Sequence, residues 1–359
     1  MENACRTLIT GASSGIGREI AVRLSRERRL VLHGRDLNRL AETQTACGGA
    51  AQHLLLPLDL AEPSGIEAAL REFLLREECH IDRFVHCAGL LKILPMRNME
   101  LPLARTIMDV NFFSAALQRQ MSYRVFLPAK LIPGQKLPVV YLLHGNGGRF
   151  SEWSNGSDVA QYAAHGLILV MPAGDSSYYV NAALKPEDRY EDYIVRDLIA
   201  DVETRFPAAS GRENRAVIGV SMGGFAAIYL ALSRPDLFSF AGAISPAIDV
   251  PSRRFTARRW GQSVRFRTIF GPDGSKSRQS RDPFLLVQSA NPAVTPYIYL
   301  TAGEQEPLLE PNRRFAARLR EHNFAYEFHT KPGGHDWGEW DSQIPGCFES
   351  LFQHITPAR

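Results

Sequence analysis

The chain has 359 residues, which exceeds an ordinary single domain and predicts two domains. Its net charge of +3 is too small to favour binding to nucleic acid or to a membrane surface. Its five cysteines are odd in number and include no C-x-x-C pair, which argues against a disulfide framework or a structural zinc site. No apolar run approaches the roughly 20 residues of a membrane span. No secretory signal is visible either, so the sequence favours a reducing cytoplasm.

The first third of the chain reads as strands alternating with helices. Strands are predicted over residues 6–9, 30–33, 54–58 and 84–86, and helices over 18–27, 39–45, 66–77 and 103–112. Such alternation implies right-handed crossovers and a parallel sheet. The first strand is followed by Thr10-Gly11-Ala12-Ser13-Ser14-Gly15-Ile16-Gly17 and then by a helix. This pattern is typical of a turn whose amide groups and helix N-terminus hold a phosphate.

Residues 1–118 resemble the front half of a short-chain dehydrogenase/reductase. The resemblance rests on the glycine-rich turn, Asp59-Leu60, Cys87-Ala88-Gly89 and Asn111. It implies an adenine contact at Asp59, a role in organising the active site for Asn111, and dinucleotide phosphates held by Gly11, Ser13, Ser14, Gly15, Ile16 and Gly17. Arg35 lies just past the second strand, where that family reads the ribose, and a cation there favours NADP over NAD. The adjacent Asp36 makes this preference weak.

The Tyr-x-x-x-Lys pair of the reductase family does not follow Asn111, and Tyr123 has Leu127 four positions later. Without a tyrosine acid and a neighbouring lysine, hydride transfer has no proton donor. Residues 1–118 are therefore expected to form a truncated Rossmann-type sheet. Three interpretations stay open for it: a vestigial or structural remnant, a module that binds NADP without turnover, and an active reductase.

A second series of strands and helices begins at Tyr123. Strands are predicted over residues 123–127, 139–143, 167–171, 216–220, 242–244, 297–301 and 326–330, and helices over 193–205, 224–233, 312–322 and 347–354. The continuous apolar run Val139–Leu143 is typical of a strand that is buried on both faces of a parallel sheet.

Gly219-Val220-Ser221-Met222-Gly223 lies between the predicted strand at 216–220 and the helix at 224–233. A G-x-S-x-G turn in this context holds a serine hydroxyl above the sheet, because glycines allow the turn to be tight. The serine becomes a nucleophile when a histidine takes its proton and a carboxylate orients the histidine. Ser221 is therefore predicted to be a catalytic nucleophile.

The base and the acid are sought after Ser221 in the chain. His335 lies on the glycine-rich loop after the last predicted strand and is the predicted base, whereas the other candidates fall in helices or in a strand: His322, His329 and His354. The acid is expected in the loop after the strand at 297–301, where Glu304 and Glu306 both qualify by position.

Two backbone amides are needed to hold the oxyanion. One is predicted at Met222, directly after the nucleophile. The other is expected in His144-Gly145-Asn146-Gly147-Gly148, with Asn146 preferred and Gly145 beside it. His144 itself is expected to be structural. Trp153 and Tyr179 are candidate substrate-pocket residues that could equally be core packing.

Residues 120–355 resemble the α/β-hydrolase esterases that include S-formylglutathione hydrolase, feruloyl and tributyrin esterases and mycolyltransferases. The resemblance rests on four stretches: 142–145, 219–224, 303–313 and 333–337. It places the family's acid, usually an aspartate before a Leu-Leu pair, on Glu306, and Glu304 stays as the alternative. The family normally has a strand before Tyr123; the sequence shows none, so we expect an esterase shortened at its front edge.

The predicted fold class is α/β, with a truncated Rossmann-type sheet at residues 1–118 followed by an α/β-hydrolase domain at residues 119–359. The predicted function is a serine hydrolase that cleaves carboxylic esters or thioesters through an acyl-enzyme, with Ser221, His335 and Glu306 as catalytic residues. The hydrolase is expected to need no metal or cofactor, and its partner is a small-molecule ester or thioester. An NADP-dependent oxidoreductase or bifunctional fusion, and a non-catalytic dinucleotide-binding protein, stay as alternatives.

Overall fold

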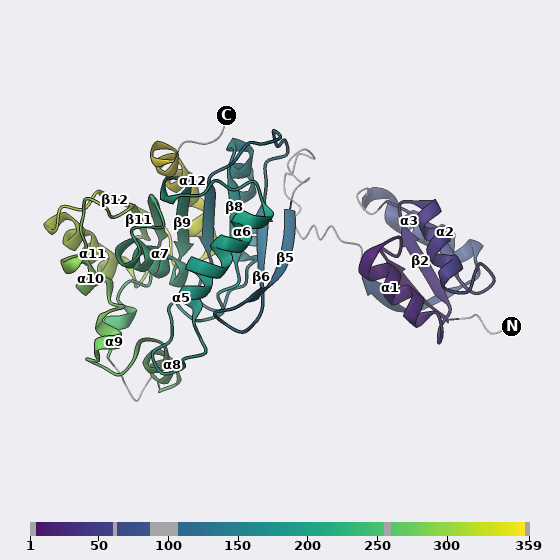
Figure 1. Ribbon diagram of the computed structural model, residues 1–359, viewed down its shortest axis with the longest axis horizontal. Coiled ribbons are helices and arrows are strands. Elements are labelled where there is room, and N and C mark those ends of the chain that lie inside the picture. The colour runs from purple at the N-terminus through teal and green to yellow at the C-terminus, as the bar shows by residue number, and fades with distance from the viewer. Residues whose placement is uncertain (1–4, 60–62, 87–106, 255–259, 356–359) are drawn as a thin grey trace. The chain divides into compact units, whose positions relative to one another are not determined.

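The computed structural model describes residues 5–59, 63–86, 107–254 and 260–355 (Figure 1). The chain divides into two compact units, Met1–Leu91 and Lys92–Arg359. Leu60, the segment Cys87–Gly89 and the first part of the helix predicted at 103–112 lie outside the described residues.

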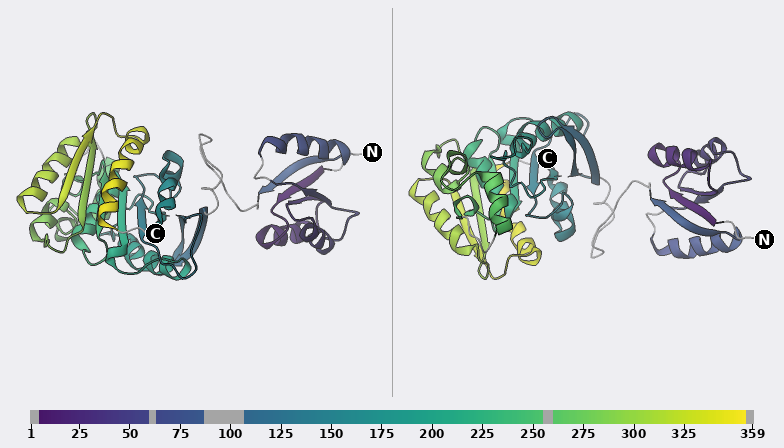
Figure 2. Two further views of the ribbon diagram at one scale, coloured as in Figure 1. Left: turned by 90° about the horizontal axis from the view of Figure 1, so that it is seen from above. Right: turned by 90° about the horizontal axis from the view of Figure 1, so that it is seen from below.

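The first unit contains a parallel sheet of four strands in the order β3-β2-β1-β4. The strands are β1 (Cys5–Thr10), β2 (Leu30–Gly34), β3 (Leu54–Pro57) and β4 (His80–His86), and the helices are α1 (Gly15–Leu24), α2 (Leu37–Ala46) and α3 (Pro63–Arg76). Because successive strand residues point to opposite faces, Ile9 packs with α1 and α2 while Leu8 packs with α3 (Figure 2). This arrangement confirms the predicted Rossmann-type parallel sheet.

The second unit contains a sheet of eight strands in the order β12-β11-β10-β9-β7-β8-β6-β5. Its strands are β5 (Ile107–Ser114), β6 (Arg119–Phe126), β7 (Val139–Leu143), β8 (Ile168–Pro172), β9 (Arg215–Val220), β10 (Phe240–Ile244), β11 (Tyr297–Gly303) and β12 (Tyr326–Lys331). Neighbouring strands pair in parallel across β12, β11, β10, β9, β7 and β8. Strand β6 is antiparallel to both of its neighbours, β5 and β8. This confirms the predicted α/β class for this part of the chain.

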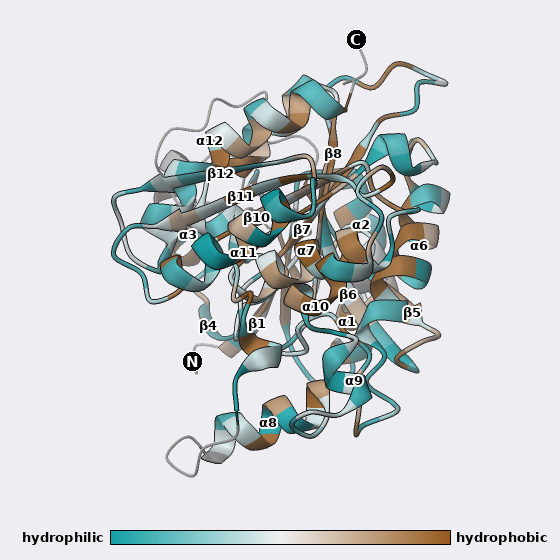
Figure 3. Ribbon diagram, turned by 90° about the vertical axis from the view of Figure 1, so that its left-hand side faces the viewer, coloured by the Kyte–Doolittle hydropathy of each residue, from teal (hydrophilic) through white to brown (hydrophobic). Residues whose placement is uncertain are grey.

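Helices cover both faces of the second sheet. They are α4 (Glu152–Gly156), η2 (Val159–His165), α5 (Tyr190–Asp192), η3 (Tyr193–Leu198), α6 (Ile199–Arg205), η4 (Arg212–Asn214), α7 (Met222–Ser233), η5 (Val250–Ser252), α8 (Trp260–Phe270), α9 (Lys276–Gln279), α10 (Pro283–Ser289), α11 (Leu309–Glu321) and α12 (Trp337–His354). One face packs against η3, α6 and α7, and the other against α4, η2 and α12. Hydrophobic residues accordingly gather on the central strands around β7 and β8 (Figure 3).

Helix α7 is buried along almost its whole length, from Met222 to Leu232. An amphipathic helix buries only one stripe, so a helix that is apolar all round belongs to the interior of a large protein. The helix contacts β7, β9 and β10 at the centre of the sheet. Its first residue is therefore held in a fixed position relative to the ends of those strands.

Strand β5 corrects two expectations. Residues 107–112, predicted as the end of a helix, belong to a strand that pairs with β6 from Ile107–Phe126 to Ser114–Arg119. The hydrolase sheet thus has the strand before Tyr123 that the sequence analysis did not find, and it is not shortened there. The expected domain boundary at residue 118 falls in the turn of this β-hairpin, so residues 107–118 belong structurally with the second sheet.

An ion pair between a buried arginine and an exposed aspartate ties β5 to β6. Arg124 on β6 is 3% exposed, and its guanidinium donates hydrogen bonds of 2.7 and 2.9 Å to the two carboxylate oxygens of Asp109 on β5. It also donates to the Ser154 hydroxyl in α4 over 2.8 Å. At the other end of the hairpin, the Ser114 hydroxyl donates to Asp197 over 2.6 Å. These contacts fix β5 to the rest of the second unit.

Within the described residues, none of the helices combines the length and apolar character needed to cross a membrane. Cys5, Cys47, Cys79 and Cys347 are free thiols. The reducing cytoplasm expected from the cysteine count stays a prediction.

Replacing Asp109 by alanine tests the assignment of β5 to the hydrolase sheet. The change leaves the buried Arg124 charge without its carboxylate, so we expect a loss of about 2 kcal/mol in the free energy of unfolding. The four tryptophans, Trp153, Trp260, Trp337 and Trp340, all belong to the second unit, so urea unfolding followed by tryptophan fluorescence reports on that unit.

The control is Asp236→Ala, which removes an exposed partner of Arg234 and should change the free energy of unfolding by less than about 0.5 kcal/mol. Equal stability of the Asp109 variant and wild type would place residues 107–114 outside the hydrolase sheet.

Candidate active site

Ser221 occupies the sharp turn between β9 and α7. Its φ of 53° and ψ of −108° are unusual for a residue with a side chain, and such strain is common where a structure must present a reactive group. The two flanking glycines are required sterically. A Cβ atom on Gly219 would collide with the backbone of Gly223, and a Cβ atom on Gly223 would collide with the carbonyl oxygen of Leu143. The G-x-S-x-G spacing therefore follows from the close approach of β7, β9 and α7.

His335 connects the serine to a carboxylate. Its Nε2 atom is 2.8 Å from the Ser221 hydroxyl oxygen, and its Nδ1 atom is 2.7 Å from Oε2 of Glu306. Because the carboxylate can only accept, Nδ1 carries the proton and Nε2 is left to accept the proton of the serine. Ser221 and His335 are partly accessible, with 9% of the serine residue and 30% of the histidine side chain exposed. The Glu306 side chain is fully buried.

Of the two glutamates on the loop after β11, Glu306 contacts His335 and Glu304 does not. The second carboxylate oxygen of Glu306 accepts a hydrogen bond of 3.1 Å from the backbone N–H of Gly303, so both of its oxygens have partners. Glu304 is exposed, and its carboxylate is 3.5 Å from the Thr330 hydroxyl on β12. The structure therefore brings Glu306 to the histidine and leaves Glu304 on the surface.

Backbone hydrogen bonds hold the acid and base loops together. The N–H of Glu304 donates to the carbonyl of Lys331 over 2.8 Å, and the N–H of Gln305 donates to the carbonyl of Gly333 over 3.0 Å. Gly303 is also required, because a Cβ atom there would be 2.6 Å from the Gly333 carbonyl oxygen. The extra methylene of a glutamate is thus accommodated in a loop whose position is fixed relative to His335.

The other downstream histidines lie away from this site. His329 is on β12, where its Nε2 is 2.7 Å from Glu327. His354 stacks on Tyr297 at 3.9 Å between ring centroids, and His322 caps the end of α11.

The predicted oxyanion donors flank the serine. Met222 opens α7, where the first N–H groups of a helix have no intrahelical acceptor and carry the positive end of the helix dipole. Gly145 lies on the other side, with its ideal Cβ position 3.7 Å from the Cβ atom of Ser221. Asn146 is exposed in a turn that is closed by a hydrogen bond of 3.1 Å from the Gly148 N–H to the Gly145 carbonyl. Both predicted loops therefore lie beside Ser221.

His144 orients the peptide between Gly145 and Asn146. It is 1% exposed, and its Nε2 accepts a hydrogen bond of 2.9 Å from the backbone N–H of Gly174. Nδ1 therefore carries the proton and donates it to the Gly145 carbonyl over 2.8 Å. Burial lowers the pKa of His144, which keeps the ring neutral in this arrangement. His144 has a structural role here.

The two candidate substrate-pocket residues, Trp153 and Tyr179, lie in the core. Trp153 is fully buried, its indole N–H donates to the Leu143 carbonyl over 3.0 Å, and it packs edge-on against Trp337. Tyr179 is also fully buried, and its hydroxyl accepts a hydrogen bond of 3.0 Å from the backbone N–H of His144. Their placement gives no support to a substrate-pocket role, because both side chains support the strand end and the loop behind the oxyanion donors.

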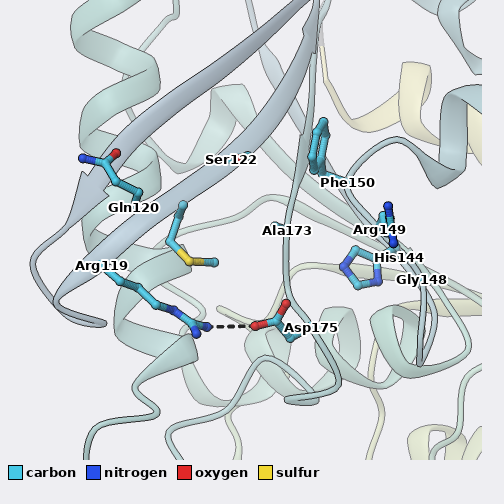
Figure 4. A pocket seen from close by; sticks show the side chains of 10 residues that line it. Arg119, Gln120, Ser122, His144, Gly148, Arg149, Phe150, Ala173 and Asp175 are labelled. Carbon is cyan, nitrogen blue, oxygen red and sulfur yellow. Dashed lines mark hydrogen bonds and ion pairs between the residues drawn. The ribbon is translucent and has the colours of Figure 1, made fainter. Parts of the chain in front are cut away.

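A cavity of about 290 Å³ that the sequence did not indicate opens on the outer side of this loop (Figure 4). Arg119 and Asp175 form an ion pair of 2.8 Å across it, and Tyr190 bonds to both. The remaining lining comes from β6, the loop after β7 and the end of β8: Gln120, Met121, Ser122, His144, Gly148, Arg149, Phe150 and Ala173.

Glu339 has a buried carboxyl close to Glu306, one of the three residues Ser221, His335 and Glu306 that form the relay of hydrogen bonds. The sequence analysis did not identify Glu339. It is 5% exposed, and its pKa is raised to about 7 by burial and by the negative charges of Glu306 and Asp336. A glutamate three residues after a helix-capping aspartate reads as an ordinary exposed helix start, so the sequence carried no signal for its burial.

The predicted dinucleotide residues are divided between the two units. Gly11 and Gly15 adopt φ angles of 69° and 54° in the turn after β1, and Ser14 forms the N-cap of α1 without a side-chain cap. Ser13 and Gly17 lie in the same turn and helix start, and the Ile16 side chain lies outside the described residues. The Arg35 guanidinium nitrogen Nη1 is 4.0 Å from the Asp59 carboxylate oxygen Oδ2.

Asn111 lies apart in the chain from the glycine-rich turn, in the second unit. It lies on β5 of the second unit, where its side-chain oxygen accepts a hydrogen bond of 2.6 Å from the Ser122 hydroxyl on β6. The structure thus pairs Asn111 into the hydrolase sheet, and its expected role at a dinucleotide site stays a prediction. Among the described residues, no group of three or more His, Cys, Asp or Glu side chains is arranged to hold a metal ion.

Comparison with known proteins identifies relatives of both parts. Residues 114–351 match the family model Esterase, described as "Putative esterase", and residues 6–130 match the model for short chain dehydrogenases. The acetyl esterase of Caldicellulosiruptor saccharolyticus is 25% identical over 258 residues, which cover 68% of this chain and 97% of that protein.

Among solved structures, the Staphylococcus aureus fluorophosphonate-binding serine hydrolase FphF, with substrate bound, is 25% identical with a TM-score of 0.60. The match covers 68% of this chain and 98% of FphF. The S. aureus S-formylglutathione hydrolase FrmB shares the fold at 24% identity, with a TM-score of 0.58 and the same coverage of each chain.

Proposed function

The chain belongs to the esterase family through residues 114–351 and is a serine esterase-type hydrolase, and we propose that it cleaves carboxylic esters or thioesters through an acyl-enzyme on Ser221. The observation that carries the proposal is the unbroken Ser221–His335–Glu306 chain, with contacts of 2.8 and 2.7 Å. In this arrangement the serine hydroxyl has a base within hydrogen-bonding distance, and the base has a buried carboxylate that fixes its tautomer.

In the first half of the proposed reaction, the Ser221 oxygen attacks the carbonyl carbon of the ester while its proton passes to Nε2 of His335. The resulting imidazolium is stabilised by Glu306, which the surrounding protein keeps fully buried. When the tetrahedral intermediate collapses, the bond to the leaving alcohol or thiol breaks and His335 returns the proton to it. The acyl group is then attached to Ser221.

The second half repeats these steps with water in place of the alcohol. His335 takes a proton from the water, which attacks the acyl carbon, and then returns a proton to the Ser221 oxygen as the acid leaves. In both halves the negative oxygen lies between the N–H of Met222 and the N–H of Asn146. His144 supports this geometry, because its bond to the Gly145 carbonyl directs the N–H of the same peptide to the opposite side.

The acetyl esterase relative supports a short acyl group as the first substrate to test. The arrangement of Ser221, His335 and Glu306 does not distinguish an oxygen from a sulfur leaving group, since His335 can protonate either. The proposal therefore covers esters and thioesters alike.

Replacing Ser221 by alanine should reduce p-nitrophenyl acetate hydrolysis to the level of buffer. Loss of the nucleophile in such a relay lowers kcat by about 10⁶-fold. The matched control is Ser210→Ala on an exposed loop, which should keep wild-type turnover. Wild-type turnover in the Ser221 variant would refute the proposed nucleophile.

The pair Glu306→Gln and Glu304→Gln separates the two acid candidates. The amide at position 306 carries no charge, so it cannot fix the tautomer of His335 and stabilise its imidazolium as the carboxylate does. We therefore expect kcat to fall by about 10³–10⁴-fold. Glu304→Gln should stay within about twofold of wild type, because exposed charges contribute little. The reverse order of effects, measured with the same ester, would make Glu304 the acid.

A specific observation also supports a second role for the first unit. Gly15, at φ 54°, has no atom within 4 Å of an ideal Cβ position, and Ser14 leaves the first N–H groups of α1 without a side-chain cap. No acidic residue lies in the first turn of that helix. We propose that this turn binds the phosphates of NADP, with Arg35 beside the ribose. The bound dinucleotide would supply hydride chemistry, but the absent Tyr-x-x-x-Lys pair leaves no proton donor for turnover.

Ser14→Asp tests this second proposal without weakening the helix. Aspartate is a favourable N-cap, so the melting temperature should not fall, whereas its charge should repel a bound phosphate. We expect NADPH affinity, measured by fluorescence titration, to fall at least about tenfold, and we expect no ketone-dependent NADPH oxidation from wild type. Unchanged affinity in the variant, or no binding by wild type, would contradict the proposal.

A further inference from the structure

Glu339 lies directly beneath the loop that carries the catalytic histidine. It belongs to the first turn of α12, and its backbone N–H donates a hydrogen bond of 3.2 Å to the N-cap carboxylate of Asp336. A Cβ atom on Gly333 would collide with the Glu339 side chain, so a glycine at that position lets the two segments touch. The ring of Trp340, the next residue, packs edge-on against His335 at 5.0 Å between ring centroids.

The carboxyl of Glu339 has few polar partners for a group that is 95% buried. Its Oε2 is 3.5 Å from the Ser245 hydroxyl, at the limit of a hydrogen bond. Its Oε1 is buried and has no hydrogen-bond partner among the described residues. Leaving such a group unpaired is costly, so stability alone gives no reason for a carboxyl here.

Ser245 places Glu339 between the strand ends that hold the relay. The residue follows β10 at a φ of 47°, and its N–H donates to the Thr301 carbonyl on β11 over 3.0 Å. The preceding residue, Ile244, accepts a hydrogen bond of 2.9 Å from the N–H of Ser221. The Glu339 carboxyl is therefore enclosed by elements that bear the nucleophile, the acid and the base.

The charged groups facing Glu339 come from three elements. Glu306 lies on the loop after β11 and Asp336 at the start of α12, and both disfavour a second negative charge. Lys331 at the end of β12 acts in the opposite direction. Burial is the largest cause, and together these influences raise the pKa of Glu339 to about 7. The group thus changes its charge in the neutral range.

We propose that Glu339 is a positioning residue whose ionisation adds a second buried negative charge behind Glu306 and thereby stabilises the imidazolium that forms on His335 during catalysis. In the protonated state Glu339 is neutral, and Glu306 acts alone. In the ionised state the field at the imidazolium is stronger, because charges interact strongly where water is excluded. The inference rests on the esterase site proposed above.

The test uses Glu339→Gln, which keeps the shape of the side chain and removes its titration. The readout is the rate of covalent labelling by a fluorophosphonate between pH 5 and 9, which does not depend on knowing the natural substrate. His335 must itself be neutral to take the serine proton, so its protonation at low pH slows both proteins, and the ratio of the wild-type rate to the variant rate isolates the effect of Glu339. This ratio should rise with a midpoint near pH 7. Below pH 6 the two should agree within about twofold, and above pH 8 the variant should be about three- to tenfold slower.

Matched variants separate this effect from a structural one. Glu304→Gln, an exposed change in the acid loop, should show the same pH-dependent rate ratio to Glu339→Gln as wild type does, and Glu339→Asp should restore that ratio with a shifted midpoint. Thermal stability gives a second readout. The raised pKa means that stability is present below the unfolded-state pKa of about 4.5 and is lost as the pH rises through about 7. Glu339→Gln should therefore melt at a higher temperature than wild type above pH 8, and at the same temperature below about pH 4.

Two results would overturn the inference: a ratio of wild-type to Glu339→Gln rate that stays near 1 at every pH, or a loss of rate in the variant that is uniform across the pH range. Failure of the proposed function would look different, because wild type would then neither hydrolyse p-nitrophenyl acetate nor react with the fluorophosphonate at any pH.

Discussion

The parallel pairing of β9, β10, β11 and β12 is the constraint on which the site depends. Because the strands run in one direction, the loops at their carboxyl ends meet along one edge of the sheet. Ser221 follows β9, Glu306 follows β11, and His335 follows β12. These three residues are far apart in the sequence. The distances between their side chains are therefore set by strand register and by glycines that let the backbones approach. The pairing of β10 with both β9 and β11 keeps that register.

The two glycine-rich turns of the chain are alike in their place between a strand and a helix, but they differ in the residues that surround them. Each connects a strand to a helix whose first-turn amide groups favour a negative charge. The turn at Ser221 faces a base, an acid and a second donor loop, all held by hydrogen bonds. The turn at Gly15 has an open approach and a nearby arginine at position 35, but the sequence supplies no tyrosine–lysine pair to complete a reductase. The difference between the two units thus lies in what surrounds the turn.

Sequence patterns predicted most of the fold, because strand periodicity and turn glycines are local signals. The order of residues along the chain also predicted that Ser221 and His335 would meet, and the structure brings them to 2.8 Å of each other. The choice between Glu304 and Glu306 needed side-chain burial, which two nearby glutamates do not reveal. Strand β5 was missed because it is an edge strand with exposed residues such as Asp109 and Asn111, and Asn111 also fits the reductase pattern. The burial of Trp153, Tyr179 and Glu339 depends on contacts between distant segments, which no local pattern encodes.

The central claim is that Ser221 is the single activated nucleophile of the chain. Its most direct test is peptide mapping by mass spectrometry after treatment with a fluorophosphonate, which reacts with activated serines. The account predicts about one adduct per chain, located on the peptide that contains Ser221, and no adduct after denaturation before treatment, because the free hydroxyl is a weak nucleophile. An adduct on another residue, or no adduct on the folded protein, would contradict it.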